Sequence, residues 1–198
     1  MKQPYHHGAL REALIAAAGT ILERDGIAAL TLRAAAREAG VSHAAPAHHF
    51  GSLAGLLSEL AAVGFVRFRE WIAAEIDAAA PTPDARALAV SRGYVGFARA
   101  APGLFRLMFR SEQLDWTNAA LGREGAAAFM LLLPPEGEGT PVLPASPQAL
   151  TRAMSHWSMV HGLASLLIDG RLEAVASKMR PGVDIEHLVA GIIRTETG

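Results

Sequence analysis

Apolar residues recur along this chain at helical spacing, and runs that alternate as a half-buried strand does are nearly absent. Over residues 8–25 the apolar side chains fall on one helical face: Leu10, Leu14, Ala17, Ala18 and Ile21. Near the C-terminus, behind Asp184 as a cap, they repeat at i, i+3, i+4, i+7 and i+8: Ile185, Leu188, Val189, Ile192 and Ile193. Ala, Leu, Arg and Glu, all good helix formers, dominate the chain. We therefore predict an all-α protein.

Glycine, proline and capping residues divide this pattern into further helices. Gly26 ends the first helix, Thr31 is expected to cap a helix over residues 32–39, and Ser42 to cap a short one over residues 43–49. The longer helices are expected over residues 53–80, 84–101, 102–110, 115–133 and 148–169. Residues 134–147, "PPEGEGTPVLPASP", hold five prolines and two glycines and are predicted to form a loop.

The two short segments, 32–39 and 43–49, have the spacing of a helix-turn-helix. Gly40 is expected to take the left-handed conformation in the turn between them. In such a pair the second helix enters the major groove of DNA and the first crosses the backbone. Pro46 would be the fourth residue after the Ser42 cap, and we expect the helix to tolerate its missing amide with some 3₁₀ character.

The residue types along this pair suit contacts with DNA. Imidazole groups can bond to base edges or phosphates, alanine methyls can pack on a thymine methyl, and helix N-termini offer amides to phosphates. The expected DNA contacts are Thr31, Arg33, Ser42, His43, Ala44, Ala47 and His48. A zinc site is the alternative for the histidines, but they largely lack the i, i+4 ligand spacing and have no acidic partner beside them. We expect no metal and no cofactor.

Composition narrows the class of protein. The chain has 198 residues, of which 51% are hydrophobic and 19% charged, as in globular proteins. The absence of cysteine excludes disulfides and thiolate zinc sites and fits a cytoplasmic protein. No apolar run approaches the roughly 18 residues that a membrane span needs, so we expect no membrane partner. The net charge of −1 means that any basic surface for DNA must be local.

Residues 5–52, which begin "YHHGALREAL" and end "HHFGS", resemble the DNA-binding domain of TetR/AcrR-type transcriptional regulators. The residues that carry the resemblance are Gly26, Thr31-Leu32, Ala36, Ala39-Gly40-Val41-Ser42 and His49-Phe50-Gly51-Ser52. Farther along, "LFRLMF" at 104–109 and the spacing of Trp157, His161 and Gly162 resemble the subgroup with a Trp-His-Gly motif. The resemblance implies a helix-turn-helix domain over residues 1–52 and a helical effector-binding and dimerisation domain over residues 53–198.

The resemblance also implies a homodimer that binds a palindromic operator, usually as a repressor, and that a small molecule releases from DNA. The apolar stripe near the C-terminus and a leucine cluster before it would then join two subunits, although internal core is the alternative. The residues expected at this interface are Leu163, Leu167, Ile185, Leu188 and Ile192. An apolar or aromatic effector would lie among Phe97, Phe105, Met108, Trp116, Phe129, Trp157 and His161. Trp157 and His161 share a helical face, so they either pack together or line that pocket.

Two departures from the family pattern affect the DNA-binding domain. Ala47 stands where the family commonly has a tyrosine that touches a phosphate, and Leu53 stands where it commonly has a lysine. Residues 1–52 carry five Lys and Arg against four Asp and Glu, a net charge of only +1. A helical dimeric adaptor with weakened or lost DNA binding is therefore the alternative function. An enzyme is not expected, because no nucleophile–base pair, phosphate-binding loop or carboxylate–histidine motif occurs.

Overall fold

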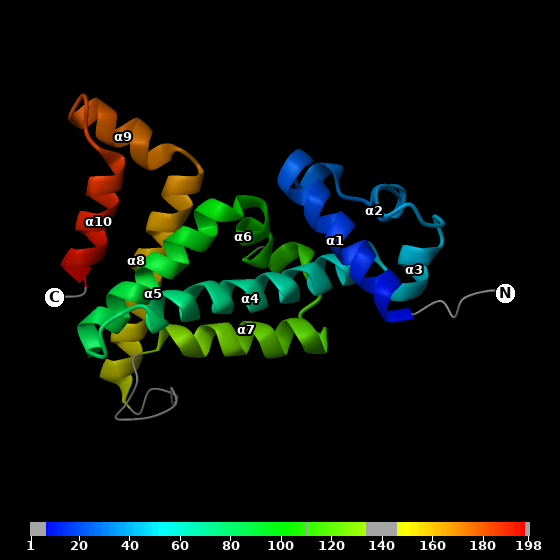
Figure 1. Cartoon of the computed structure of the whole chain (residues 1–198), viewed down its shortest axis with the longest axis horizontal. Coiled ribbons are helices and arrows are strands. Elements are labelled where there is room, and N and C mark those ends of the chain that lie inside the picture. The colour runs from blue at the N-terminus through cyan, green and yellow to red at the C-terminus, as the bar shows by residue number, and fades with distance from the viewer. Residues whose placement is uncertain (1–6, 110, 134–145, 197–198) are drawn as a thin grey trace. The chain divides into compact units, whose positions relative to one another are not determined.

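The computed structural model describes residues 7–109, 111–133 and 146–196, and every regular element in these ranges is a helix (Figure 1). The all-α prediction is therefore confirmed. The helices, including two 3₁₀ segments, are α1 (His7–Asp25), η1 (Ile27–Ala29), α2 (Leu32–Glu38), α3 (Ala45–Phe50), α4 (Leu53–Asp77), α5 (Pro83–Ala100), α6 (Pro102–Met108), η2 (Ser111–Gln113), α7 (Ala119–Leu132), α8 (Pro147–Ile168), α9 (Arg171–Met179) and α10 (Ile185–Glu196). Among the described residues, no helix is both long and apolar enough to cross a membrane.

The chain packs as two compact units. Unit 1 consists of Met1–Phe65 and Gly103–Gly125, and unit 2 of Val66–Pro102 and Ala126–Gly198. Helix α4 therefore contributes its first half to unit 1 and its second half to unit 2. The expected domain boundary between residues 52 and 53 does not coincide with a boundary of these units, and it stays a prediction. The predicted loop at 134–147 lies almost wholly outside the described residues, and its last residue, Pro147, begins α8.

Unit 1 joins α1 to α6 through one carboxylate. Glu23, at the end of α1, accepts hydrogen bonds from the backbone amides of Gly103 at 3.0 Å and Leu104 at 2.7 Å. These amides open α6 and have no partner within the helix, so Glu23 caps it from a distant part of the chain. A Cβ on Gly103 would lie 2.9 Å from the Glu23 carboxylate and 3.0 Å from the Leu22 carbonyl oxygen. Only glycine allows this close approach.

The start of α7 is also fixed by α4. The Asp115 amide donates to the Ser58 hydroxyl at 2.8 Å, and the Asn118 side chain donates to Glu59 at 3.1 Å. Asn118 in turn accepts from the Leu121 amide at 2.9 Å, which makes it the capping residue. The prediction that this helix starts at Asp115 was therefore wrong, because the segment before Asn118 is held against α4 instead.

Unit 2 is built around α5, which packs against α8, α10 and the second half of α4. Phe68 of α4 meets the rings of Tyr94 and Phe97 edge-on, with centroids 4.9 and 5.4 Å apart. Arg99 donates to Glu186 of α10 through its two terminal guanidinium nitrogens, at 2.8 and 2.7 Å. Helix α9 was not predicted from the sequence. Gly170 follows α8 in the left-handed conformation, and the chain re-enters a helix directly.

Candidate nucleic-acid interface and effector cavity

The helix-turn-helix forms with the predicted turn. Thr31 caps α2, because its hydroxyl accepts from the Ala34 amide at 3.0 Å. Gly40 has a φ of +66°, the left-handed conformation expected for it. The Val41 amide then donates to the Ala36 carbonyl at 3.0 Å, which closes the turn. Ala36 is fully buried, so α1 and α2 approach closely at this point.

The start of α3 differs from the prediction. The helix begins at Ala45, its N-cap is Ala44, and Ser42 does not cap it through its side chain. Pro46 is therefore the second helical residue, where a backbone amide would have no partner within the helix. No 3₁₀ distortion is needed to accommodate the proline. Its ring is fully buried and anchors the start of α3 to unit 1.

The residues predicted to contact DNA lie on the surface. His43 and Ala44 belong to the turn, Ala47 and His48 to α3, and all four are exposed. The other three predicted contacts are also exposed: Thr31, Arg33 and Ser42. Their exposure confirms that the second helix and its turn present an open face. Contact with DNA itself stays a prediction. Among the described residues, no three His, Asp or Glu side chains are grouped as metal ligands.

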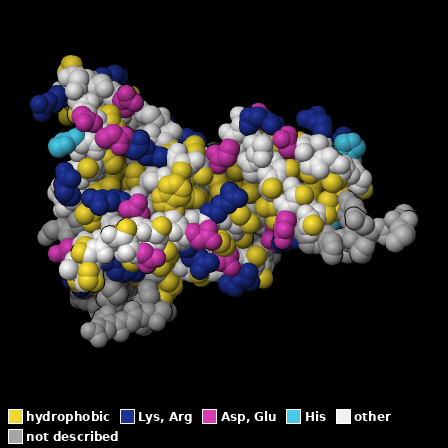
Figure 2. All heavy atoms as spheres, viewed as in Figure 1, with side chains coloured by type: hydrophobic (Ala, Val, Ile, Leu, Met, Phe, Trp, Pro, Cys, Tyr) yellow, Lys and Arg dark blue, Asp and Glu magenta, His cyan; other side chains and the backbone are white. Residues whose placement is uncertain are grey.

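The charge available to this face is small. Arg24 of α1 binds Glu38 of α2 at 3.1 and 3.2 Å, and it also pairs with Asp25. Hydrogen bonds to Asp25 and then to Glu38 raise the pKa of Arg24 above its ordinary value. On the face seen in Figure 2, Lys and Arg side chains are scattered and do not gather over α2 and α3. The low net charge counted in the sequence is thus not offset by a local basic cluster on that face.

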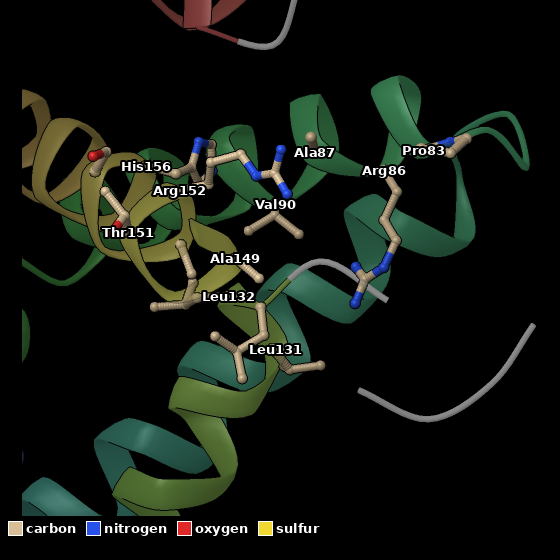
Figure 3. Close-up of a pocket in the computed structure, with 13 residues that line it drawn as sticks. Pro83, Arg86, Ala87, Val90, Leu131, Leu132, Ala149, Thr151, Arg152 and His156 are labelled. Carbon is tan, nitrogen blue, oxygen red and sulfur yellow. The ribbon is translucent and has the colours of Figure 1, made fainter. Parts of the chain in front are cut away.

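Unit 2 contains a cavity of about 570 Å³ between α5, the end of α7 and the start of α8 (Figure 3). Leucine, valine and alanine side chains form much of its wall, and Arg86, Arg152 and His156 add basic groups. Its volume is within the range of small-molecule sites. The sequence analysis missed this cavity. The sequence did contain a signal for it, because on two helices a basic residue precedes another residue of the wall by one turn. These pairs are Arg86 and Val90 on α5, and Arg152 and His156 on α8.

None of the residues predicted to bind the effector lines this cavity. Phe105, Met108 and Trp116 belong to unit 1, where Trp116 is 50% exposed and the other two are buried. The remaining four belong to unit 2: Phe97, Phe129, Trp157 and His161. A role for any of them in effector binding stays a prediction.

The predicted pair of Trp157 and His161 forms a polar network with Tyr94, which is fully buried on α5. The Trp157 indole donates to the Tyr94 hydroxyl at 3.3 Å, and that hydroxyl lies 2.8 Å from Nδ1 of His161. Donation of the Tyr94 proton to Nδ1 satisfies all three groups and requires a neutral imidazole. Burial lowers the pKa of His161 and raises that of Tyr94, which favours the same neutral pair.

We expect the free energy of unfolding to fall as the pH is lowered from about 7.5 to 5 through His161. The pKa of His161 in the folded protein lies below its ordinary value of 6.5. Between these two pKa values the unfolded chain binds a proton and the folded chain does not. The loss begins near the ordinary pKa and levels off below the folded one. Urea denaturation of wild type and His161→Asn across this range measures it. Parallel pH profiles for the two proteins would contradict it.

Comparison with known families identifies the protein class. A family model described as bacterial regulatory proteins of the tetR family matches residues 14–60. A second model, described as the tetracyclin repressor-like C-terminal domain, matches residues 87–188, more than half of the chain. The chain belongs to the TetR family. The resemblance of the sequence to this family is thereby confirmed, and the first match contains the whole helix-turn-helix of this TetR-family protein.

Solved structures of other proteins share the fold of this chain. A protein of unknown function from Rhodococcus sp. RHA1 is 32% identical, covers 99% of this chain and 97% of its own, and has a TM-score of 0.76. A TetR-like transcriptional regulator from the same organism is 14% identical over 99% of this chain and 96% of its own, with a TM-score of 0.62. The multidrug binding protein EbrR, solved with imidazole, is 17% identical over 98% and 93%, also with a TM-score of 0.62. A comparison with curated proteins gave no significant match.

The predicted dimer residues of this TetR-family chain fall into two groups. Leu163 is only 5% exposed and packs inside its own chain, which corrects the expectation that it offers surface to a partner. The other four are half-buried and keep some free surface: Leu167, Ile185, Leu188 and Ile192. Val189 and Ile193 of the same stripe are buried in unit 2. The stripe thus serves the internal core on one side, and dimerisation through its other side stays a prediction.

Proposed function

We propose that this TetR-family protein is a ligand-responsive transcriptional regulator that binds a palindromic operator as a homodimer and represses until a small molecule releases it. The observation that supports this most directly is the open face of α3 and its turn, where His43, Ala44, Ala47 and His48 are exposed. A single helix-turn-helix, which we call the DNA-binding head, reads only a short site. Two heads spaced by a dimer would read successive major grooves about 34–36 Å apart.

Ligand response would pass through α4, because this helix belongs to both units. A ligand bound in unit 2 that displaces the second half of α4 would move the half that carries the DNA-binding head. The effector can act only through a difference in its affinity for the DNA-binding state and the released state. In the dimer, the same displacement would change the separation of the two heads.

A gel-shift assay with the DNA that flanks the protein's own gene tests the proposal. We expect a specific complex that is reversed by at least one compound from a small-molecule screen. Absence of any specific complex, with a dimer present, would instead support the helical adaptor. That alternative is favoured by Ala47 and Leu53, which stand where phosphate contacts are expected.

We expect the affinity for DNA to depend only weakly on salt. Few Lys and Arg side chains are available near α2 and α3, and Arg24 is already paired, so few counterions are displaced on binding. Titration of the operator between about 50 and 200 mM salt should give a log–log slope shallower than about −6. A steeper slope would show that other basic residues reach the phosphates.

A further inference from the structure

The cavity of unit 2 combines an apolar wall with basic side chains. Thirteen residues line it, and none of these described residues is acidic. Arg86 comes from α5, and Arg152 and His156 come from α8. The apolar part of the wall consists of Pro83, Ala87, Val90, Leu131, Leu132, Leu133, Ala149 and Ala153. The cavity is therefore amphipathic, with positive charge on its polar side.

Arg86 has no acidic partner among the described residues. Its Nη1 atom is buried and has no hydrogen-bond partner among the described residues. Burial lowers the pKa of Arg86 from its ordinary value, yet a guanidinium remains charged at neutral pH. Arg86 as a whole is half-buried, and a partly desolvated charge without a partner is destabilising unless an anion binds to it.

A second arginine reaches the same cavity from the opposite helix. Figure 3 shows the Arg152 side chain extending from α8 toward α5, with Val90 between it and the guanidinium of Arg86 in this view. His156, one turn after Arg152, lies with Nε2 3.3 Å from the Ser91 hydroxyl of α5. This contact holds the imidazole at the cavity wall. Both helices thus contribute nitrogen groups to one polar region.

We infer that this cavity binds an organic carboxylate: an apolar alkyl or aryl body that carries one carboxyl group. A guanidinium presents parallel N–H groups that match the two oxygens of a carboxylate. The leucines of α7 and Val90 suit the apolar body, and about 570 Å³ holds a molecule of drug-like size. The role of such a ligand as the effector rests on the proposed function. The sequence predicted an apolar or aromatic effector, and the arginines of the cavity add a carboxyl group to that expectation.

Isothermal titration of the full-length protein with matched head groups tests the ligand class. The probes are 4-phenylbutanoate, 4-phenylbutanamide and 4-phenylbutylamine, which share one body, together with octanoate and inorganic phosphate. We expect at least one of the two acids to bind with a Kd below 1 mM, about 4 kcal/mol. The matching amide and amine should bind at least ten-fold more weakly than the phenyl acid, and phosphate alone should not bind. Binding of neither acid, or equal binding of acid and amine, would overturn the inference.

Three variants place the binding in this cavity. Arg86→Gln should weaken acid binding at least ten-fold, and Arg152→Gln should weaken it in the same direction. Arg92→Gln is the matched control, because Arg92 is an exposed arginine of the same helix that does not line the cavity. Thermal unfolding by circular dichroism checks that each variant is folded. If Arg86→Gln does not fold, Arg152→Gln and the series of head groups still test whether the acid binds in this cavity through its carboxyl group. Unchanged acid binding in folded Arg86→Gln would overturn the inference.

The outcomes separate this inference from the proposed function. If a compound that is not an acid releases the DNA while no acid binds, the regulator proposal stands and the carboxylate assignment fails. If the acids bind through Arg86 but the protein forms no specific complex with DNA, the cavity assignment stands and the regulator proposal fails.

Discussion

Replacement of Gly93 by alanine should lower the free energy of unfolding by about 2 kcal/mol, although alanine is the better helix former. Gly93 lies in α5 where that helix meets α4. A Cβ there would be 2.8 Å from the Cα of Ile72 and 3.0 Å from its Cγ1. Ile72 is fully buried, and the nearest atom belongs to the backbone, so α4 and α5 would have to separate. That separation would loosen the packing of Phe68 on Tyr94.

Urea denaturation with two further glycine variants isolates this effect. A Cβ on Gly122 of α7 meets nothing within 4 Å, so Gly122→Ala should raise the free energy of unfolding by up to about 1 kcal/mol. A Cβ on Gly64 meets chiefly the flexible end of Met108, and its substitution should destabilise less than that of Gly93. A Gly93→Ala protein as stable as wild type would show that the two helices do not approach this closely.

Replacement of both His43 and His48 by alanine should weaken operator binding at least ten-fold, or about 1.4 kcal/mol. Both imidazoles are exposed on the open face of the helix-turn-helix, and the two residues between them on that face are alanines. The histidines therefore hold most of the hydrogen-bonding capacity available for base edges. Competition gel shifts with operator and random DNA measure the change. The loss should be larger for the operator, because base contacts specify sequence and phosphate contacts do not.

His187→Ala provides the control for this experiment. His187 is an exposed histidine of α10 in unit 2, so its removal should leave operator affinity unchanged. A double variant that loses operator and random DNA equally would assign the histidines to phosphates. A double variant that binds like wild type would rule out reading by either residue, and the reading role of this face would then have to be abandoned.

Helix positions followed from local pattern wherever glycine, proline or a capping hydroxyl marked an end. Thr31, Gly40 and Pro102 lie where their residue types predicted. The start of α7 did not follow, because Asp115 and Asn118 are both capable caps. Contacts with α4, more than fifty residues earlier, select Asn118. Helix α9 was missed because its apolar residues form no buried stripe; Val175 and Met179 are 56% and 83% exposed.

The two candidate sites differed in how far sequence could predict them. The face predicted to bind DNA depends on residues within one short segment, so its exposure was predictable. The cap was wrong, because Ala44 takes the place expected for Ser42, and with it the start of the helix and the 3₁₀ character expected at Pro46. The cavity requires Arg86, Arg152 and the end of α7 to meet, which only tertiary packing decides. The effector residues were instead predicted from aromatic side chains, and in a sequence a large ring is as consistent with an ordinary core as with a pocket.

The late start of α3 affects how this head can evolve. Because Pro46 fixes the first turn of the helix, His43 and Ala44 precede it and belong to the turn. Both side chains are exposed, so substitutions there remove no buried packing. Two of the four positions predicted to read DNA can therefore change without loss of buried packing. Duplicated copies of such a gene could acquire new operators by changing two adjacent codons.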